Sequence, residues 1–471
     1  MQYGNHREKI NLIRQNKLSL QENVKKFLHK IKEKKHLNAF NFVFEEEALS
    51  QAAEIENKIK EGKAGKAAGM VIAVKDNISI KKQPMTCSSG ILKNFEPVYT
   101  ATAIQKLLDE DAIIIGKTNC DEFAMGSSNE TSVFGAVLNP HDTNRVPGGS
   151  SGGSAVAVAA GLCDASLGSD TGGSIRQPAA FCGVFGLKPT YGKVSRFGLT
   201  AFASSFDTIG PFANNLYDLT LLLNIISEAD EKDSTSHTSP TVNIEENGID
   251  GKIKLGLPKE YFGEGLNKEI KSKIDLVIKN LPYKYFEFKE ISLPYTEYAI
   301  ATYYILTTAE ASSNLARYDG VRFGFRSKNS ATLADMYVNT RTEGFGKEVK
   351  RRIMLGTYVL SSGYYDAYYK KAQQVRRLFK EDFDRAFSEV DIILTPTTPT
   401  TAFKIGEKTT DPLEMYLNDI YTTSANLAGI PALNIPVGSD SNGLPIGMQL
   451  MAQQFDEQKL LATANLINRY L

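Results

Sequence analysis

The sequence predicts an α/β protein with a large mixed β-sheet that is flanked by helices on both faces. Short apolar runs at 70–74, 112–116 and 164–167 are bounded by Gly, Asp or Asn and read as buried strands. Helical patterns at 103–110 and 154–161 alternate with these runs, and this alternation is typical of layered α/β domains with much parallel sheet. The chain has 471 residues, 42% of them hydrophobic, which is enough for a large core.

The remaining elements follow in chain order. Residues 8–62 predict two or three polar helices, because apolar residues recur there at a spacing of three to four. Residues 227–250 are polar and predict a surface loop rather than a linker, since strand-like runs resume directly after it. The later predicted elements are strands at 252–257, 390–394, 433–437 and 446–451, and a helix at 456–470.

Composition narrows the class of protein. Lys and Arg together number 54, as do Asp and Glu, so nothing overall suggests a nucleic-acid or membrane-surface protein. The lysines at 25–35 read as a solvated helix face. The sequence has no CxxC pair and no cluster of histidines, so a zinc site is not expected. Free cysteines in a chain of this length are typical of a reducing compartment. Because the N-terminus also lacks an apolar leader, we expect a cytoplasmic protein. The cysteines are Cys87, Cys120, Cys163 and Cys182.

Two serines lie in separate Gly/Ser turns, Ser150 and Ser174, and a lysine, Lys75, ends an apolar run upstream. Serine is a weak nucleophile and needs a base. Of the five histidines only His141 is near the turns in sequence, so a Ser-His-Asp triad lacks a well-placed base. A buried lysine can serve instead, because burial lowers its pKa. The alternative is that Lys75 simply caps a strand edge.

Three other kinds of catalytic or nucleotide-binding motif can be excluded, because the motif or the residues that must accompany it are absent. Residues 148–152 match GxSxG literally, but that motif needs an acid and then a histidine downstream, and only His237 follows, in the predicted loop. Ser79 and Lys82 form an SxxK without the KTG of β-lactamases. Neither GxxxxGK[ST] nor GxGxxG occurs here, so we expect no ATP or NAD site on this chain.

The turn before Ser174 offers consecutive backbone N–H groups at Thr171, Gly172 and Gly173, which can form an oxyanion hole. A flexible loop is the alternative interpretation. Apolar runs flank the turn directly, however, and a linker would not lie inside core-like sequence.

These residues resemble the amidase signature family, whose members use a Ser–cis-Ser–Lys triad. The similar segments are GGSSGGSAVAVAAG, SLGSDTGGSIRQPAAFCGVFGLKPTYGKVSRFGL and VIAVKDNI. Residues 119–140, 310–324, 345–376 and 411–436 are similar to the branch that works in tRNA-dependent amidotransferases. The resemblance covers nearly the whole chain. It implies a single amidase domain over 1–471, made of N-terminal helices (1–62), a signature core (65–225) and a C-terminal part (251–471).

The resemblance implies a role for each residue of the triad. Ser174 is similar to the acyl-forming nucleophile, Ser150 to the bridging serine after a cis peptide bond, and Lys75 to the terminal base. The expected reaction is the hydrolysis of glutamine to glutamate and ammonia.

The resemblance also implies receptors for the two charges of glutamine. Arg352 would bind the α-carboxylate, Asp419 the α-ammonium, and Tyr303 would assist. Arg351 and Tyr304 are adjacent alternatives, and Arg352 could also be an exposed helix charge. Three further residues are expected to line the pocket: Met125, Gly126 and Ser128.

The resemblance finally implies partners. A B subunit would bind mischarged tRNA and use ATP and magnesium, a small C subunit would complete a heterotrimer, and this chain would carry no cofactor or metal. The ammonia would convert Glu-tRNA(Gln), and also Asp-tRNA(Asn) in some cases, to the amidated product. The first alternative is a stand-alone amidase that acts on small-molecule, peptide or fatty amides. The second is a scaffold with a decayed site, which the intact triad disfavours.

Overall fold

The computed structural model describes residues 3–244, 251–409 and 412–471, and the strands of these ranges form one sheet of eleven strands. The sheet is mixed, with the strand order β1-β3-β2-β4-β6-β5-β10-β11-β9-β7-β8. The strands are β1 (Phe40–Val43), β2 (Val71–Lys75), β3 (Ile113–Thr118), β4 (Ala165–Asp170), β5 (Phe185–Lys188), β6 (Thr208–Ala213), β7 (Ile253–Pro258), β8 (Phe286–Ile291), β9 (Ile392–Pro396), β10 (Ala432–Ser439) and β11 (Pro445–Met451).

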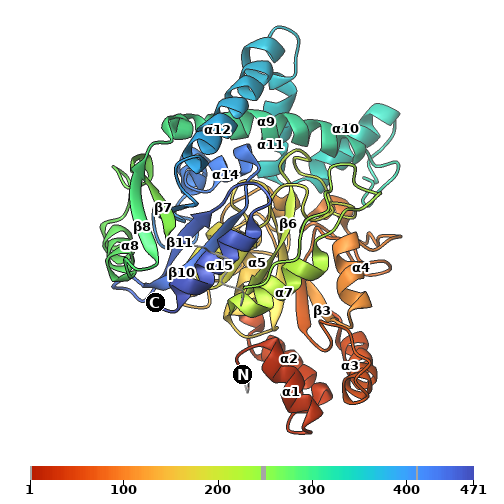
Figure 1. Cartoon of the computed structure of the whole chain (residues 1–471). Coiled ribbons are helices and arrows are strands. Elements are labelled where there is room, and N and C mark those ends of the chain that lie inside the picture. Colours follow the sequence, from red (N-terminus) through yellow and green to blue (C-terminus); the bar gives the residue numbers. More distant parts are fainter. Residues whose placement is uncertain (1–2, 245–250, 410–411) are drawn as a thin grey trace.

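Helices cover both faces of the sheet (Figure 1). Helices α9 to α12 form a layer at one end, and α1 to α3 lie at the opposite end near the N-terminus. The helices are α1 (His6–Arg14), α2 (Leu20–Glu33), α3 (Glu45–Lys60), α4 (Thr102–Asp109), α5 (Gly152–Ala159), α6 (Arg176–Cys182), α7 (Leu216–Ile226), α8 (Lys268–Asn280), α9 (Ala299–Asn314), α10 (Leu333–Gly344), α11 (Lys347–Val359), α12 (Lys371–Phe387), α13 (Pro412–Tyr416), α14 (Thr423–Ala428) and α15 (Glu457–Asn468).

The central strands are buried on both sides, which explains why the sequence shows them as continuous apolar runs. In β2, Ile72 and Val74 face the hydrophobic cluster under α4, α7 and α15. Val71 and Ala73 face the cluster formed with α1, α2, α3, α5 and α6. Successive side chains of a strand point to opposite faces, so one short apolar segment serves both layers.

The order of the strands places the site. Strands β2 and β4 are parallel neighbours, so their carboxyl ends meet at the same edge of the sheet. Lys75 is the last residue of β2 and Asp170 the last residue of β4. The loop after β4 runs through Ser174 into α6, and this edge therefore collects the predicted chemistry.

The predicted mixed α/β class is confirmed, and so are the predicted strands at 70–74, 112–116 and 164–167. The N-terminal region, predicted to hold two or three helices, forms α1, α2 and α3. The sequence patterns missed β1, β5, β6 and β8. Strand β6 reads TIGPFA, and its Gly and Pro argue against a central strand in a pattern analysis. Residues 227–244 of the predicted loop hold only isolated bridges, and residues 245–250 lie outside the described residues.

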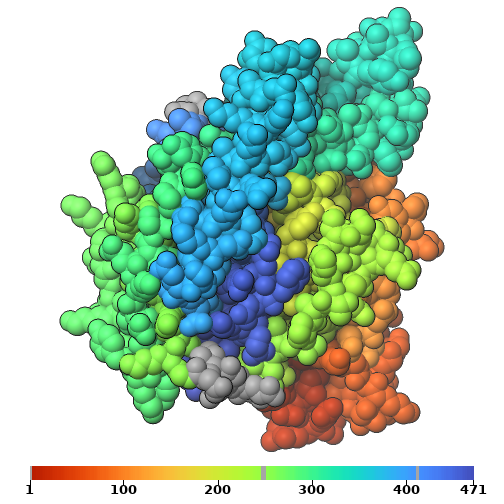
Figure 2. Space-filling model, turned by 45° about the horizontal axis from the view of Figure 1, so that its top comes forward, coloured from red at the N-terminus to blue at the C-terminus, as the bar shows by residue number. Residues whose placement is uncertain are grey.

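The C-terminal helix α15 lies on the surface of the molecule. Figure 2 shows the C-terminal helix α15, in dark blue, between the light-blue α12 region and the yellow-green α7 region.

None of the helices in the described ranges combines the length and the apolar character that a bilayer span requires.

Candidate active site

The amine of Lys75 lies in a fully buried cage of serine oxygens at the end of β2. Its Nζ donates to Ser150 Oγ at 2.7 Å, to Ser151 Oγ at 2.9 Å and to Ser169 Oγ at 2.9 Å. Burial lowers the pKa of Lys75 to about 8. The lysine is therefore an internal group beside Ser150 and does not cap a solvated strand edge.

The two predicted serines lie on adjoining turns. The peptide bond between Gly149 and Ser150 is cis, as the resemblance implies. The Ser151 N–H donates to the carbonyl oxygen of Ser174 at 3.2 Å, and this bond ties the turns together. Ser150 is fully buried, whereas Ser174 keeps 9% of its surface exposed. Within the described residues, no hydrogen bond joins the hydroxyl of Ser150 to that of Ser174.

The glycines before Ser174 are required by close contacts. A Cβ on Gly172 would lie 2.6 Å from Cζ of Tyr303, and Gly173 has a φ of +140°. The Gly173 N–H donates to Asp170 Oδ1 at 2.9 Å and is engaged in this structure, so its use as an oxyanion donor stays a prediction. The N–H groups of Thr171 and Gly172 have no such acceptor among the described residues and stay predictions.

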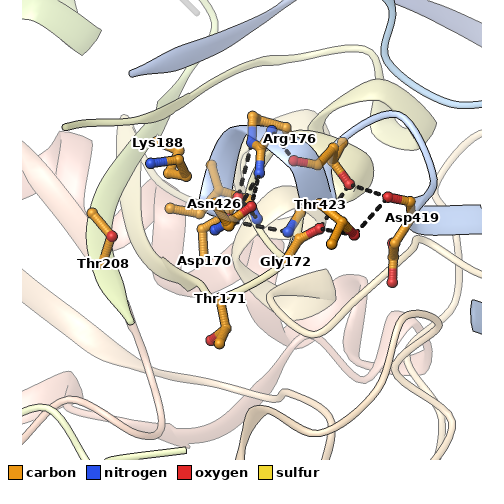
Figure 3. A network of polar contacts seen from close by, with 12 residues as sticks. Asp170, Thr171, Gly172, Arg176, Lys188, Thr208, Asp419, Thr423 and Asn426 are labelled. Carbon is orange, nitrogen blue, oxygen red and sulfur yellow. Dashed lines mark hydrogen bonds and ion pairs between the residues drawn. The ribbon is translucent and has the colours of Figure 1, made fainter. Parts of the chain in front are cut away.

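A network of buried polar groups surrounds the turn and fixes it (Figure 3). Arg176 donates to both carboxylate oxygens of Asp170 and also to Asn426 Oδ1. Although burial alone would raise the pKa of Asp170, the guanidinium of Arg176 holds it at about 2. Thr423 Oγ1 lies at 3.2 Å from the Gly172 carbonyl oxygen and at 2.7 Å from that of Asp419. The segment around α14 therefore holds the turn of residues 171–174 in place.

Arg352 and Arg351 differ sharply in their surroundings. Arg352 is buried, with its guanidinium 5.2 Å from the ring centre of Tyr304 and 5.6 Å from that of Tyr416. Its Nε donates to Glu348 Oε1 at 2.9 Å, and its two terminal amino groups have no hydrogen-bond partner among the described residues. Arg351 has a 37% exposed side chain and pairs with Glu348 at the surface. The interpretation of Arg352 as an exposed helix charge is therefore wrong.

Asp419 is a buried carboxylate at the end of the short helix η8 (Leu417–Asp419). Its Oδ2 accepts a hydrogen bond from Ser127 Oγ, and its Oδ1 has no partner among the described residues. Burial raises the pKa of Asp419 to about 7. A buried acid with a free oxygen is suited to bind a cationic group.

A cavity of about 330 Å³ opens beside these groups, and Gly126, Ser128 and Arg352 are among its lining residues. Ser127 also lines the cavity and links it to Asp419. The side chain of Met125 packs fully buried in the core cluster of Phe123 and Phe202 and is not among the residues that line this cavity, so its place in the glutamine pocket stays a prediction. Ser174, Tyr303 and Asp419 are not among the lining residues.

The alternative tyrosines take separate positions. Tyr303 lies against Gly172 in the turn before Ser174, as the close contact above shows. Tyr304 stacks on Tyr416 with ring centres 3.7 Å apart, beside Arg352. Each of the two candidates thus contacts a different part of the site.

Several residues of the site were not predicted: Ser127, Ser151, Ser169, Asp170, Arg176, Glu348, Tyr416 and Asn426. Glu348 lies four residues before Arg352 on one helix, and that spacing places the two side chains on the same face. This signal could have found Glu348. The remote partner Asn426 had no signal, because its contact with Asp170 spans 256 residues.

A sheet edge with a buried lysine beneath two glycine-rich serine turns defines a class of α/β proteins with a histidine-free Ser–Lys cluster. The family model described as Amidase matches residues 22–461. The chain belongs to the Amidase family and is an enzyme of the amidotransferase and amidase type.

Within this family the chain is similar to two kinds of enzyme, amidotransferase A subunits and a peptide amidase. The chain is 56% identical over 452 residues to the A subunit of a glutamyl-tRNA(Gln) amidotransferase from Chlorobium phaeobacteroides, with 95% of each chain covered. The crystal structure of the corresponding A subunit of the glutamyl-tRNA(Gln) amidotransferase from Thermotoga maritima matches with a TM-score of 0.79 and 41% identity, over 96% of this chain and 92% of that chain. A peptide amidase from Stenotrophomonas maltophilia matches with a TM-score of 0.80 and 28% identity, over 98% of this chain and 95% of that chain.

Proposed function

We propose that this chain is the glutaminase subunit of a tRNA-dependent amidotransferase and that Lys75, Ser150 and Ser174 carry the reaction. The observation that supports this most directly is the 2.7 Å hydrogen bond between the buried Lys75 amine and Ser150 Oγ. Relatives at 56% and 41% identity are named as the A subunit of such an enzyme.

In this proposal neutral Lys75 takes the proton of Ser150, which in turn takes the proton of Ser174 as the Ser174 oxygen attacks the side-chain amide carbon of glutamine. The proton then returns through Ser150 to the leaving nitrogen, and ammonia departs. Water attacks the acyl-enzyme, loses its proton to the same relay, and releases glutamate while Ser174 is restored. Backbone N–H groups at Thr171 and Gly172 would hold the oxyanion.

The charged ends of glutamine have matching receptors. The terminal amino groups of Arg352 and one oxygen of Asp419 have no partner among the described residues, and they suit the α-carboxylate and the α-ammonium, respectively. Tyr303 would support the substrate beside the nucleophile turn, and Gly126 and Ser128 would line the approach.

We further propose the arrangement of the complex that the resemblance implies. Ammonia passes to a B subunit that binds mischarged tRNA and uses ATP and magnesium, and a C subunit completes the heterotrimer in the cytoplasm. The stand-alone amidase is not favoured, because the peptide amidase shares 28% identity with this chain while an amidotransferase subunit shares 56%.

Substitution of the nucleophile tests the proposal. Ser174→Ala should lower glutamine hydrolysis by at least about 10³-fold, because no other group supplies the attacking oxygen. The assembled complex should still amidate tRNA from free ammonium chloride. Ser361→Ala, at an exposed turn, is the control and should keep both activities. Retained glutamine hydrolysis in Ser174→Ala would remove Ser174 from the proposal.

A further inference from the structure

A charged side chain that lines the cavity, Glu348, has no role in the chemistry above. Glu348 lies on α11 four residues before Arg352, with 14% of its side chain exposed. Its Oε1 accepts from Arg352 Nε at 2.9 Å and from the Tyr416 hydroxyl at 3.0 Å. One carboxylate oxygen therefore joins α11 to α13, two helices that are distant in sequence.

The way in which Glu348 holds Arg352 leaves the rest of the guanidinium free. An arginine fork binds a carboxylate best through two parallel N–H donors. Glu348 instead takes the Nε side and leaves both terminal amino groups without a partner among the described residues. The guanidinium plane is fixed by Tyr304 and Tyr416, whose stacked rings lie beside it. Arg352 is thus oriented before any ligand arrives.

The bond to Tyr416 connects this orientation to the other charge receptor. Tyr416 ends α13, and η8 follows immediately and ends at Asp419. Glu348 therefore ties the helix that carries Arg352 to the segment that carries Asp419. A single carboxylate can in this way set the distance between the two receptors of a zwitterion.

The geometry points to Glu348 as a positioning residue that makes the site selective for amides bearing both an α-carboxylate and an α-ammonium group. Glu348 itself lines the cavity, and the role inferred for it is exerted through its bonds to Arg352 and Tyr416. This inference rests on the proposed glutaminase function and adds a determinant of substrate class to it.

Kinetics of the full chain with its partner subunits test the inference, using glutamine and 4-aminobutanamide, which lacks only the α-carboxylate. Glu348→Ala should raise KM for glutamine at least about tenfold while kcat falls less than about threefold. Its kcat/KM for 4-aminobutanamide should equal that of the wild type. Glu348→Gln, which keeps the acceptor for Nε, should recover most of the KM, and Tyr416→Phe should raise it slightly.

A matched control exists on α12. Glu381 accepts from Arg377 Nε at 2.9 Å, also at a spacing of four residues, but both side chains are exposed. Glu381→Ala should leave KM unchanged. An unchanged KM for glutamine in both Glu348 variants, or equal losses on both substrates, would overturn the positioning role. A wild-type complex that does not hydrolyse glutamine would instead refute the proposed function itself.

Discussion

At the scale of the residue, the decisive feature is that Lys75 has no counterion. Its amine contacts serine oxygens, and no carboxylate lies within salt-bridge distance among the described residues. A buried ammonium without a partner is costly, so the proton is held weakly and the pKa falls to about 8. Asp419 shows the converse effect, since burial raises its pKa to about 7.

These two groups predict the pH dependence of the reaction. Lys75 must be neutral, which requires a pH above about 8, and Asp419 must be ionised to bind the α-ammonium, which requires a pH above about 7. kcat/KM for glutamine should therefore rise with pH through both values, with a steeper slope below 7. In kcat only the limb near 8 should remain, because the bound ammonium keeps Asp419 ionised. Initial rates from about pH 6 to about pH 9 measure both profiles.

Asp419→Asn provides the control for this assignment. The variant should lose the limb near 7 and keep the limb near 8, at a lower kcat/KM. A profile that retains both limbs would show that another group titrates near 7.

Residues of the site could be predicted from sequence where local pattern carries the information. Lys75 ends an apolar run, and both serines lie in glycine-rich turns between core segments. Ser127 could not be predicted in this way, because its role depends on Asp419, which lies 292 residues later.

At the scale of the element, the turn between β4 and α6 depends on α14. The carboxylate of Asp170 accepts from the backbone on both sides of Ser174, at the Gly173 and Ile175 N–H groups. Arg176 neutralises this carboxylate and reaches across to the Thr422 carbonyl oxygen at 2.9 Å. The turn is consequently held by the ion pair between the two residues that flank it, Asp170 and Arg176, and by the bonds of Arg176 to the segment around α14.

Removal of the charge of Asp170 should destabilise the protein strongly. Asp170→Asn leaves the buried Arg176 uncompensated, and we expect a loss of about 3–5 kcal/mol in the free energy of unfolding. With a pKa of about 2, Asp170 stabilises the fold above about pH 4 and loses this effect as the pH falls toward 2. Urea unfolding near neutral pH therefore measures the full contribution.

An exposed pair gives the comparison for this substitution. Asp366 pairs with Lys370 on the surface, where the two side chains are 80% and 62% exposed. Asp366→Asn should change stability by less than about 0.5 kcal/mol. Equal effects of the two substitutions would contradict the structural role of Asp170.

The close approach of Tyr303 to the nucleophile turn gives another test. Gly172→Ala places a Cβ 2.6 Å from the ring of Tyr303, so either the ring or the turn must move. We expect kcat/KM for glutamine to fall at least about tenfold, because small misplacements of reacting groups are costly. Gly263→Ala, where the nearest atom is 4.0 Å away, should be neutral. Wild-type kinetics for Gly172→Ala would show that this contact is unimportant.

Elements were predictable where strands are buried and apolar, as for β2 and β3. The edge strand β8 reads FEFKEI and, among the described strands, pairs with β7 alone. Its charged residues break the apolar pattern by which a strand is predicted. Strand β5 has four residues and lies in the sheet between two antiparallel partners, which local pattern does not reveal.

At the scale of the whole molecule, strands from distant parts of the chain are interleaved in the sheet. Strand β10 pairs with β5 on one side and with β11 on the other. The sheet of the signature core therefore continues directly into that of the C-terminal part. This continuity supports the prediction of a single domain.

Fragments of the chain test that organisation. Neither residues 1–225 nor residues 251–471 should fold alone, because each would expose one side of the β5–β10 junction and its apolar layer. Co-expression of both fragments should restore a folded pair. Circular dichroism and size-exclusion chromatography measure these states. A cooperative unfolding transition for 251–471 alone would contradict the single domain.

The contacts between residues 170–176 and the segment around α14 also determine when the site can form during synthesis of the chain. Thr422 Oγ1 donates to the Gly172 carbonyl oxygen across 250 residues of sequence. A nascent chain on the ribosome would thus hold Lys75, Ser150 and Ser174 long before it holds Thr422, Thr423 and Asn426, which brace the Ser174 turn, and Asp419, which we propose binds the α-ammonium. We expect such a chain to have no glutaminase activity until its last strands emerge from the ribosome. Unfinished copies would therefore not hydrolyse glutamine in the cell.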